Sequence, residues 1–259
     1  MKYKLYSYFN DKIKRIAEQS QALTQFELQE PNEDSITDLL KRKYNVIEFD
    51  GARYKDFMPF VKAVDWKTNS IGTADCILLT DNAYKPYNIL AESIASILKK
   101  NVARVNSQLP VIIIGDVHFV MSVASKLALS GFIKIVVSLV VSASDSEESI
   151  LREFERKIRS FVFNLDLKII PISELTSADQ AGFLLISNFK REQNKDAYDL
   201  LVYFNFLSEG ASFFDCNSIE DSYLVDDARK ADIFVIDEVE ILENKYNNLL
   251  ELLKNHSLV

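Results

Sequence analysis

The sequence contains few of the residues that build metal centres and disulfide frameworks. Among its 259 residues are only two cysteines and two histidines. Cys76 and Cys216 lie far apart and form no CxxC spacing, so the cysteines indicate neither a metal site nor a disulfide framework. Two isolated cysteines are compatible with the reducing conditions of the cytoplasm.

Long basic runs and long apolar runs are also missing. No run of consecutive lysine and arginine exceeds three residues, and the net charge is −8. Nucleic acids and anionic membrane surfaces attract basic patches, so neither is an expected partner. No apolar run approaches the length of a membrane span, and the polar N-terminus lacks the apolar core of a signal peptide. We therefore expect a cytoplasmic protein.

The chain has an ordinary balance of 48% apolar and 26% charged residues, and it is long enough for one large domain or two ordinary ones. Strand-like runs alternate with segments of helical periodicity, which predicts an α/β fold with a doubly wound, mainly parallel sheet. Strands are expected at 3–8, 24–28, 46–49, 76–79, 85–89, 111–114, 133–141, 167–170, 183–187, 200–204 and 233–236, and helices at 13–17, 36–40, 55–64, 90–105, 119–128, 146–161 and 239–253. The polar residues 106–108 mark the expected domain boundary.

The clearest unit is PVIIIGDVHFVMSVASKLALSGFIKIVVSLVV, residues 110–141. An apolar run typical of a strand buried on both faces ends at Gly115. Apolar residues then recur at helical spacing up to Gly131, and a second strand-like run follows. Such a strand–helix–strand unit predicts a right-handed crossover of the dinucleotide-binding type.

The turn of this unit does not suit a dinucleotide. A dinucleotide-binding turn needs glycines, because Cβ atoms hold the pyrophosphate away from the backbone N–H groups. Here Asp116, Val117 and His118 follow Gly115. A carboxylate at Asp116 would add roughly 1 to 4 kcal/mol of repulsion at contact distance from a phosphate. The pattern predicts the fold of a nucleotide-binding domain with a degenerate nucleotide turn, of which Gly115 is the retained part.

Several segments, in order along nearly the whole chain, resemble the shikimate dehydrogenase family. IGTADCILLTDNAYKPYNIL, residues 71–90, resembles the family's IGAVNT segment, hairpin and YNTDG. FDGARYK, residues 49–55, is similar to the segment that ends in the family's catalytic lysine, and IIIG, residues 112–115, corresponds to the nucleotide-binding strand and its first glycine. DEVEILENKYNNLLELL, residues 237–253, resembles the family's DGLxMLVxQ helix.

This resemblance implies two domains. The first is an N-terminal α/β substrate domain, residues 1–105, completed by a C-terminal helix of residues 239–255. The second is a C-terminal domain, residues 106–238, with a Rossmann-like doubly wound parallel sheet.

The resemblance carries over only part of the family's active site. Lys55 matches the catalytic lysine, which works with an aspartate on the proton of the hydroxyl group that gives up hydride. The aspartate's position holds Leu90, which cannot accept a proton or a hydrogen bond. The implied substrate-binding positions are Asp75, Asn88 and Lys245, where the family has asparagine at the first and glutamine at the last.

Other positions weaken the implied site further. Of the family's paired serines, only Ser7 has a counterpart, and the arginine that would bind the 2′-phosphate of NADP falls near Val140. Lys55 is by default an exposed lysine at a helix start, and Asp75 is equally compatible with a surface acid beside a hairpin. No metal site is implied.

Three hypotheses follow. The leading one is a non-catalytic shikimate dehydrogenase-like protein, which binds an unidentified small molecule or protein partner in the cleft between its domains and needs no cofactor. The alternative is an oxidoreductase that uses NAD or NADP on shikimate or a related hydroxy acid, with Lys55 handling the proton. A purely structural role is the third, and a homodimer is compatible with each. The resemblance implies losses both among the catalytic and substrate-binding residues and in the nucleotide turn. These combined losses favour the first hypothesis, because a change of substrate alone would spare the glycine turn.

Overall fold

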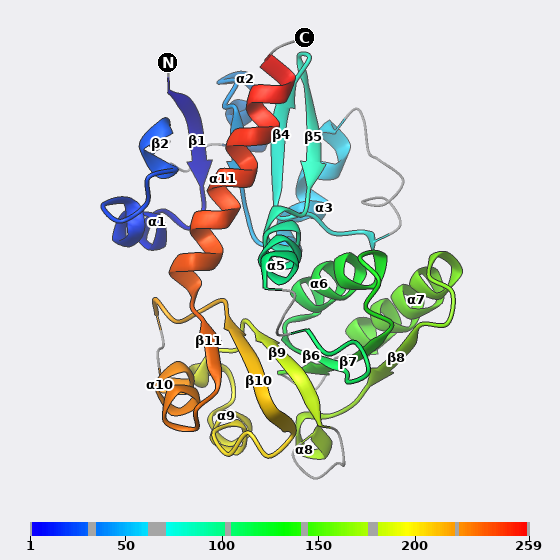
Figure 1. Cartoon of the computed structure of the whole chain (residues 1–259). Helices are drawn as coiled ribbons and strands as arrows, with labels where there is room; N and C mark the ends of the chain where they lie inside the picture. Colours follow the sequence, from blue (N-terminus) through cyan, green and yellow to red (C-terminus); the bar gives the residue numbers. More distant parts are fainter. Residues whose placement is uncertain are drawn as a thin grey trace. The chain divides into compact units, whose positions relative to one another are not determined.

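The computed structural model describes residues 2–30, 35–61, 71–101, 105–140, 145–175, 181–220 and 223–257. The chain divides into two compact units. The first unit comprises residues 1–93 and 242–259, and the second comprises residues 94–241. Each unit contains its own sheet, so the predicted α/β class with two sheets is confirmed (Figure 1). The ranges given above for the two domains stay a prediction.

The first unit is built on a five-stranded mixed sheet. Its elements are β1 (Tyr3–Ser7), α1 (Asn10–Ala17), η1 (Leu23–Gln25), β2 (Phe26–Gln29), α2 (Ile36–Lys41), β3 (Val46–Glu48), η2 (Gly51–Arg53), α3 (Tyr54–Phe57), η3 (Met58–Phe60), β4 (Cys76–Thr80) and β5 (Ala83–Tyr87), together with the start of α5 (Ile89–Lys100) and most of α11 (Glu238–Ser257). The strand order is β2-β1-β3-β4-β5. Asp81 and Asn82 join β4 to β5 with φ angles of 51° and 59°, which confirms the predicted hairpin turn.

The two faces of this sheet carry different side chains. Tyr6 and Ile47 belong to an apolar cluster with residues of α2 and α3. Their strand neighbours Ser7 and Glu48 point to the opposite face, because side chains alternate along a strand. Ser7 is paired with Glu48, and Glu48 with Cys76, so these three buried side chains form one row across β1, β3 and β4.

The second unit is built on a six-stranded sheet in which every pairing is parallel. Its elements are β6 (Val111–Gly115), α6 (Val117–Leu129), β7 (Lys134–Leu139), α7 (Asp145–Phe161), β8 (Asp166–Ile169), α8 (Ile172–Leu175), β9 (Gly182–Ser187), η5 (Arg191–Gln193), α9 (Lys195–Leu201), β10 (Leu207–Asp215), α10 (Tyr223–Lys230) and β11 (Phe234–Ile236). The strand order β11-β10-β9-β6-β7-β8 reverses between β6 and β9. This is the predicted doubly wound, Rossmann-like order.

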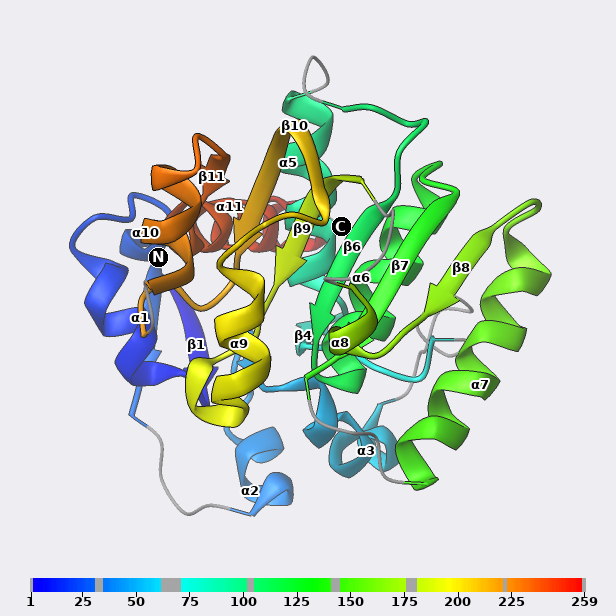
Figure 2. The same cartoon turned by 90° about the horizontal axis from the view of Figure 1, so that it is seen from below.

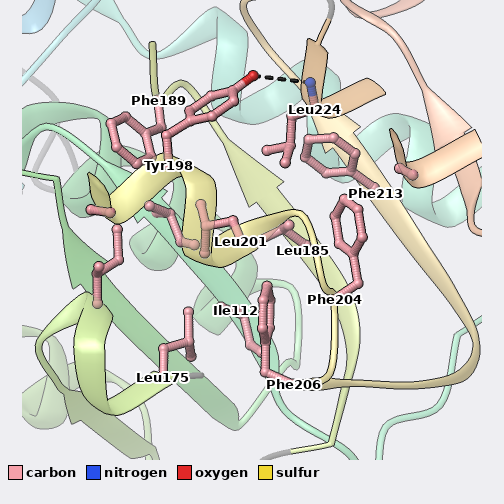
Figure 3. Close-up of a cluster of buried hydrophobic side chains, with 14 of the residues drawn as sticks. Ile112, Leu175, Leu185, Phe189, Tyr198, Leu201, Phe204, Phe206, Phe213 and Leu224 are labelled. Atoms are coloured by element: carbon pink, nitrogen blue, oxygen red, sulfur yellow. Dashed lines mark hydrogen bonds between the residues drawn. The ribbon is translucent and has the colours of Figure 1, made fainter. Parts of the chain in front are cut away.

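One face of the six-stranded sheet is covered by α8, α9 and α10. Ile112 and Ile114 of β6 pack there in one apolar cluster with residues of these helices, and Figure 2 shows α8 and α9 over this face. Within the cluster, the Tyr198 ring meets the Phe189 ring edge-on at a centroid distance of 5.3 Å. The Tyr198 hydroxyl accepts a hydrogen bond from the Leu224 N–H at 2.9 Å (Figure 3). None of the described helices is long and apolar enough to cross a membrane.

Two predicted elements were wrong. Residues 200–204, predicted as a strand, lie at the end of α9 and in the turn after it, and the neighbouring strand β10 begins only at Leu207. A short apolar run fits a buried strand and a buried helix equally well, so its periodicity could not separate them. The helix predicted at 55–64 ends at Phe57 and continues as a 3₁₀ turn containing Pro59, which lacks an N–H group. Residues 62–64 lie outside the described residues.

We expect Tyr198→Phe to lower the free energy of unfolding by about 1–2 kcal/mol, because the buried Leu224 N–H loses its acceptor. Tyr203→Phe is the matched control, since that side chain is 76% exposed. Urea unfolding followed by circular dichroism measures both variants. Equal stabilities of the two variants would show that this hydrogen bond contributes nothing.

Candidate functional site

The strand order of the second unit reverses at Gly115 and Asn188. A doubly wound sheet binds ligands at the carboxyl ends of the strands that flank such a reversal. Gly115 is the last residue of β6, and Asn188 directly follows the neighbouring strand β9. Asp116 comes next after Gly115 and is the N-cap residue of α6. These three residues stand where a Rossmann-like domain offers a helix N-terminus to an anionic ligand.

Asp116 closes this helix N-terminus with its own carboxylate. Its Oδ1 accepts hydrogen bonds from the N–H groups of His118 and Phe119, both at 3.0 Å. Its Oδ2 accepts from Nδ2 of Asn188 at 2.7 Å, and Oδ1 of Asn188 accepts from the Asp116 N–H at 3.3 Å. A carboxylate is favoured at a helix start by both the free N–H groups and the helix dipole. Asp116 therefore uses the donors that a phosphate would need.

Gly115 has a role in this arrangement that requires no ligand. A Cβ atom at Gly115 would lie 1.9 Å from Oδ1 of Asn188 and 2.7 Å from Cδ1 of Phe119. The space that glycine leaves is therefore taken by a side chain of the protein. Asn188 is held in turn through its carbonyl, which accepts a hydrogen bond from the Asn217 side chain. That Gly115 contacts a cofactor stays a prediction.

A buried polar cluster occupies the Ser7 and Glu48 face of the sheet in the first unit. Oε2 of Glu48 accepts hydrogen bonds from the Ser7 hydroxyl at 2.8 Å and from the Tyr246 hydroxyl at 3.2 Å. Oε1 forms an ion pair with Nζ of Lys245. Glu48 is 2% exposed and Lys245 is 4% exposed. A buried ion pair is tolerated only when further hydrogen bonds satisfy its atoms, and the two hydroxyl groups supply them here.

Lys245 lies close to two carboxylates. Burial by itself lowers the pKa of Lys245, but the charges of Glu48 and Asp75 outweigh burial and raise this pKa above the ordinary value for lysine. Burial, reinforced by Glu48, raises the pKa of Tyr246 well above its usual range. Lys245 therefore stays charged and Tyr246 stays neutral at physiological pH. Lys245 was predicted as a substrate-binding residue, and the structure joins it to an acid of its own chain.

Asp75 accepts the N–H groups at the start of α5 from a distant position in the sequence, whereas Asp116 directly precedes the helix that it caps. The two carboxylate oxygens of Asp75 accept hydrogen bonds from the N–H groups of Ile89 and Leu90, at 2.8 and 2.6 Å. Burial raises the pKa of Asp75, while the charge of Lys245 and the two N–H donors act in the opposite direction. The acid predicted here as a substrate-binding or surface residue thus has a defined structural role.

The two other residues predicted for this unit lie on different elements. Asn88 directly precedes α5, and its side-chain amide donates to the carbonyl of Thr73 at 2.8 Å. Asn88 and Asp75 therefore meet at one helix start. Lys55 is exposed in the short helix α3. That any of these residues binds or transforms a substrate stays a prediction. The described residues hold no group of three or more His, Cys, Asp or Glu side chains that could bind a metal ion.

Sequence reasoning missed Glu48, Tyr246 and Asn188 as members of these clusters. A signal for the pairing of Glu48 with Lys245 was present. Glu48 has the same strand parity as the buried Val46, and Lys245 falls at helical spacing with buried apolar residues of α11. An acid and a lysine that both occupy core-facing positions are expected to pair, because neither charge is stable alone in a core.

The sequence matches no protein-family model and no curated protein. Solved structures, however, resemble the chain over 98% of its length. One is the shikimate 5-dehydrogenase of Listeria monocytogenes in complex with shikimate and NAD, with a TM-score of 0.74, 11% identity and 91% of that chain covered. Another is the quinate dehydrogenase of Corynebacterium glutamicum in complex with NAD, with a TM-score of 0.73, 12% identity and 94% of that chain covered.

A shikimate 5-dehydrogenase-like protein is similar as well, with a TM-score of 0.63, 14% identity and 91% of that chain covered. Together these likenesses show that the chain has the fold of the shikimate and quinate dehydrogenases. The fold implied by the sequence segments is therefore confirmed. At this level of identity the likeness extends to the fold and no further.

Asp116→Ala is expected to lower the free energy of unfolding by about 1–2 kcal/mol, because α6 loses its N-cap. Asp116→Ser is the matched control, since a serine hydroxyl can accept the same N–H groups without a charge. Chemical denaturation measures both variants. If Asp116→Ala is as stable as the wild type, the hydrogen bonds to His118 and Phe119 do not stabilise the helix.

Lys245→Met is expected to lower the free energy of unfolding by about 3–5 kcal/mol at neutral pH, because Glu48 stays buried without its cation. The folded-state pKa of Lys245 is raised, so its stabilisation is complete below the ordinary lysine pKa of 10.5 and is lost as the pH rises through the folded-state pKa. The stability difference between wild type and Lys245→Met should therefore shrink above pH 10.5.

Glu48→Gln/Lys245→Met is the control for this experiment. It removes both charges and should recover much of the stability lost in the single variant. Denaturant unfolding across the pH series measures all three proteins. A double variant no more stable than Lys245→Met would contradict the assignment of the loss to an unpaired charge.

Proposed function

We propose that this protein acts by binding and not by hydride transfer. In this proposal it is a non-catalytic protein with the shikimate dehydrogenase fold, which takes a small ligand or a protein partner and uses neither NAD nor NADP. The observation that carries the proposal is the Asp116 carboxylate on the N–H groups of His118 and Phe119.

A nicotinamide dinucleotide would have to displace this carboxylate. Displacement breaks two N-cap hydrogen bonds and the hydrogen bond from Nδ2 of Asn188, and each such bond contributes about 0.5–1.5 kcal/mol. The displaced carboxylate would also stay near the diphosphate and repel it. The space beside Gly115 is filled by Asn188, so the diphosphate could not approach the backbone as closely as a glycine turn allows.

The catalytic residues implied by the family resemblance are also incomplete. General acid–base chemistry on a hydroxyl group needs a positioned proton carrier. Lys55 is the one matching residue, and the position of its aspartate partner holds Leu90, whose N–H is already bound to Asp75. Lys245, at a position implied to bind substrate, is paired with Glu48. These features together support a loss of the redox reaction.

The alternative is an oxidoreductase that uses NAD or NADP on shikimate or a related hydroxy acid. It draws support from two similar dehydrogenases whose structures are complexes with NAD. A measurement of nucleotide binding distinguishes the two functions.

We expect no change in the melting temperature when NAD or NADP is titrated to millimolar concentration. A ligand at 100 times its Kd would stabilise the fold by about 2.7 kcal/mol and raise the melting temperature by several degrees. Inorganic pyrophosphate is the control for non-specific anion effects. A rise of several degrees with either nucleotide, and not with pyrophosphate, would overturn the non-catalytic proposal and favour the oxidoreductase.

A further inference from the structure

We propose that Glu48 is a tethered carboxylate which occupies a carboxylate-binding site formed by Lys245, Ser7 and Tyr246. With the Glu48 side chain removed, this site would take a free small monocarboxylate. With Glu48 in place, the first unit is closed to carboxylate ligands at this position. The inference concerns the first unit alone and does not depend on whether the second unit binds a nucleotide.

The donors of this site come from two elements that converge on one carboxylate. Ser7 belongs to β1, and Lys245 and Tyr246 are neighbours in α11. The ammonium group meets Oε1, while the two hydroxyl groups meet Oε2 at 2.8 and 3.2 Å. One cation and two neutral donors, divided between the two oxygens, satisfy three of the about four acceptor positions of a carboxylate.

The donors of this site are buried and cannot form hydrogen bonds to solvent water instead. Ser7 and Tyr246 are fully buried, and Lys245 is 4% exposed. A buried ammonium group without an anion carries a large desolvation penalty. Asp75 is the other nearby carboxylate, but both of its oxygens accept N–H groups at the start of α5. Removal of Glu48 would therefore leave a positively charged site whose best occupant is a small anion.

The atoms that are removed by the substitution Glu48→Ala indicate which ligand the site would bind. Glu48→Ala removes Cγ and the carboxyl group, and these atoms together correspond to acetate. Formate lacks one carbon of this fragment and propionate adds one. Because cores are close-packed and respond to a single methylene, we expect acetate to bind best, formate less well and propionate worst.

The test is thermal unfolding of Glu48→Ala in sodium acetate, formate or propionate, each compared with sodium chloride at the same ionic strength. We expect acetate to raise the melting temperature of Glu48→Ala by several degrees with saturation. The wild type and Glu48→Gln, in which a side chain still fills the site, should show no such rise. Glu48→Ala/Lys245→Met should show none either, because it lacks the cation.

If Glu48→Ala does not fold in sodium chloride, we test whether it refolds in sodium acetate and follow refolding by circular dichroism. Recovery of the folded signal in acetate and not in chloride supports the proposal. Three results overturn it: no effect of any carboxylate on Glu48→Ala, an equal effect on Glu48→Ala/Lys245→Met, or an equal effect on the wild type. A role of Glu48 in stability alone predicts the first of these results, so the experiment separates the two roles.

Discussion

Lys245 in the last helix and Glu48 in the third strand form an ion pair across 197 positions of sequence. A lysine buried to this degree requires an anion, and the anion in turn requires the hydroxyl groups of Ser7 and Tyr246. The pair fastens α11 to a sheet whose five strands all lie in the first 87 residues. The first unit is therefore completed only by a segment that follows the whole second unit, and its assembly depends on non-local contacts.

Carboxylates of the chain itself recur at the positions where an anionic ligand would be stabilised. Asp75 binds the N–H groups at the start of α5, Asp116 binds those at the start of α6, and Glu48 binds Lys245. Each satisfies a positive or hydrogen-donating group that would otherwise attract an anion. The protein shares its fold with dehydrogenases that bind NAD, but carboxylates of its own chain accept the hydrogen bonds of these donors. Both proposals rest on this combination.

Much of the fold could be predicted because its signals are local. The unit β6–α6–β7 follows from two apolar runs around a helical period, and the Asp81–Asn82 turn follows from residues that tolerate positive φ. The strand expected at 200–204 was wrong because its short apolar run has no decisive period. Asp116 was recognised as an obstacle to phosphate. Its bonds to Asn188, 72 residues away, were beyond any local signal.

The sequence by itself determined the alternation of strands and helices, the doubly wound class of the second sheet and the loss of the glycine turn. Side-chain periodicity and turn chemistry act over a few residues, so these features can be inferred without knowing which helices and strands pack against each other. Only the tertiary structure decided that Glu48 meets Lys245 and that Asn188 fills the space beside Gly115. Such pairs depend on strand register and helix placement between distant segments, because a shift of one residue would turn Glu48 to the other face of its sheet.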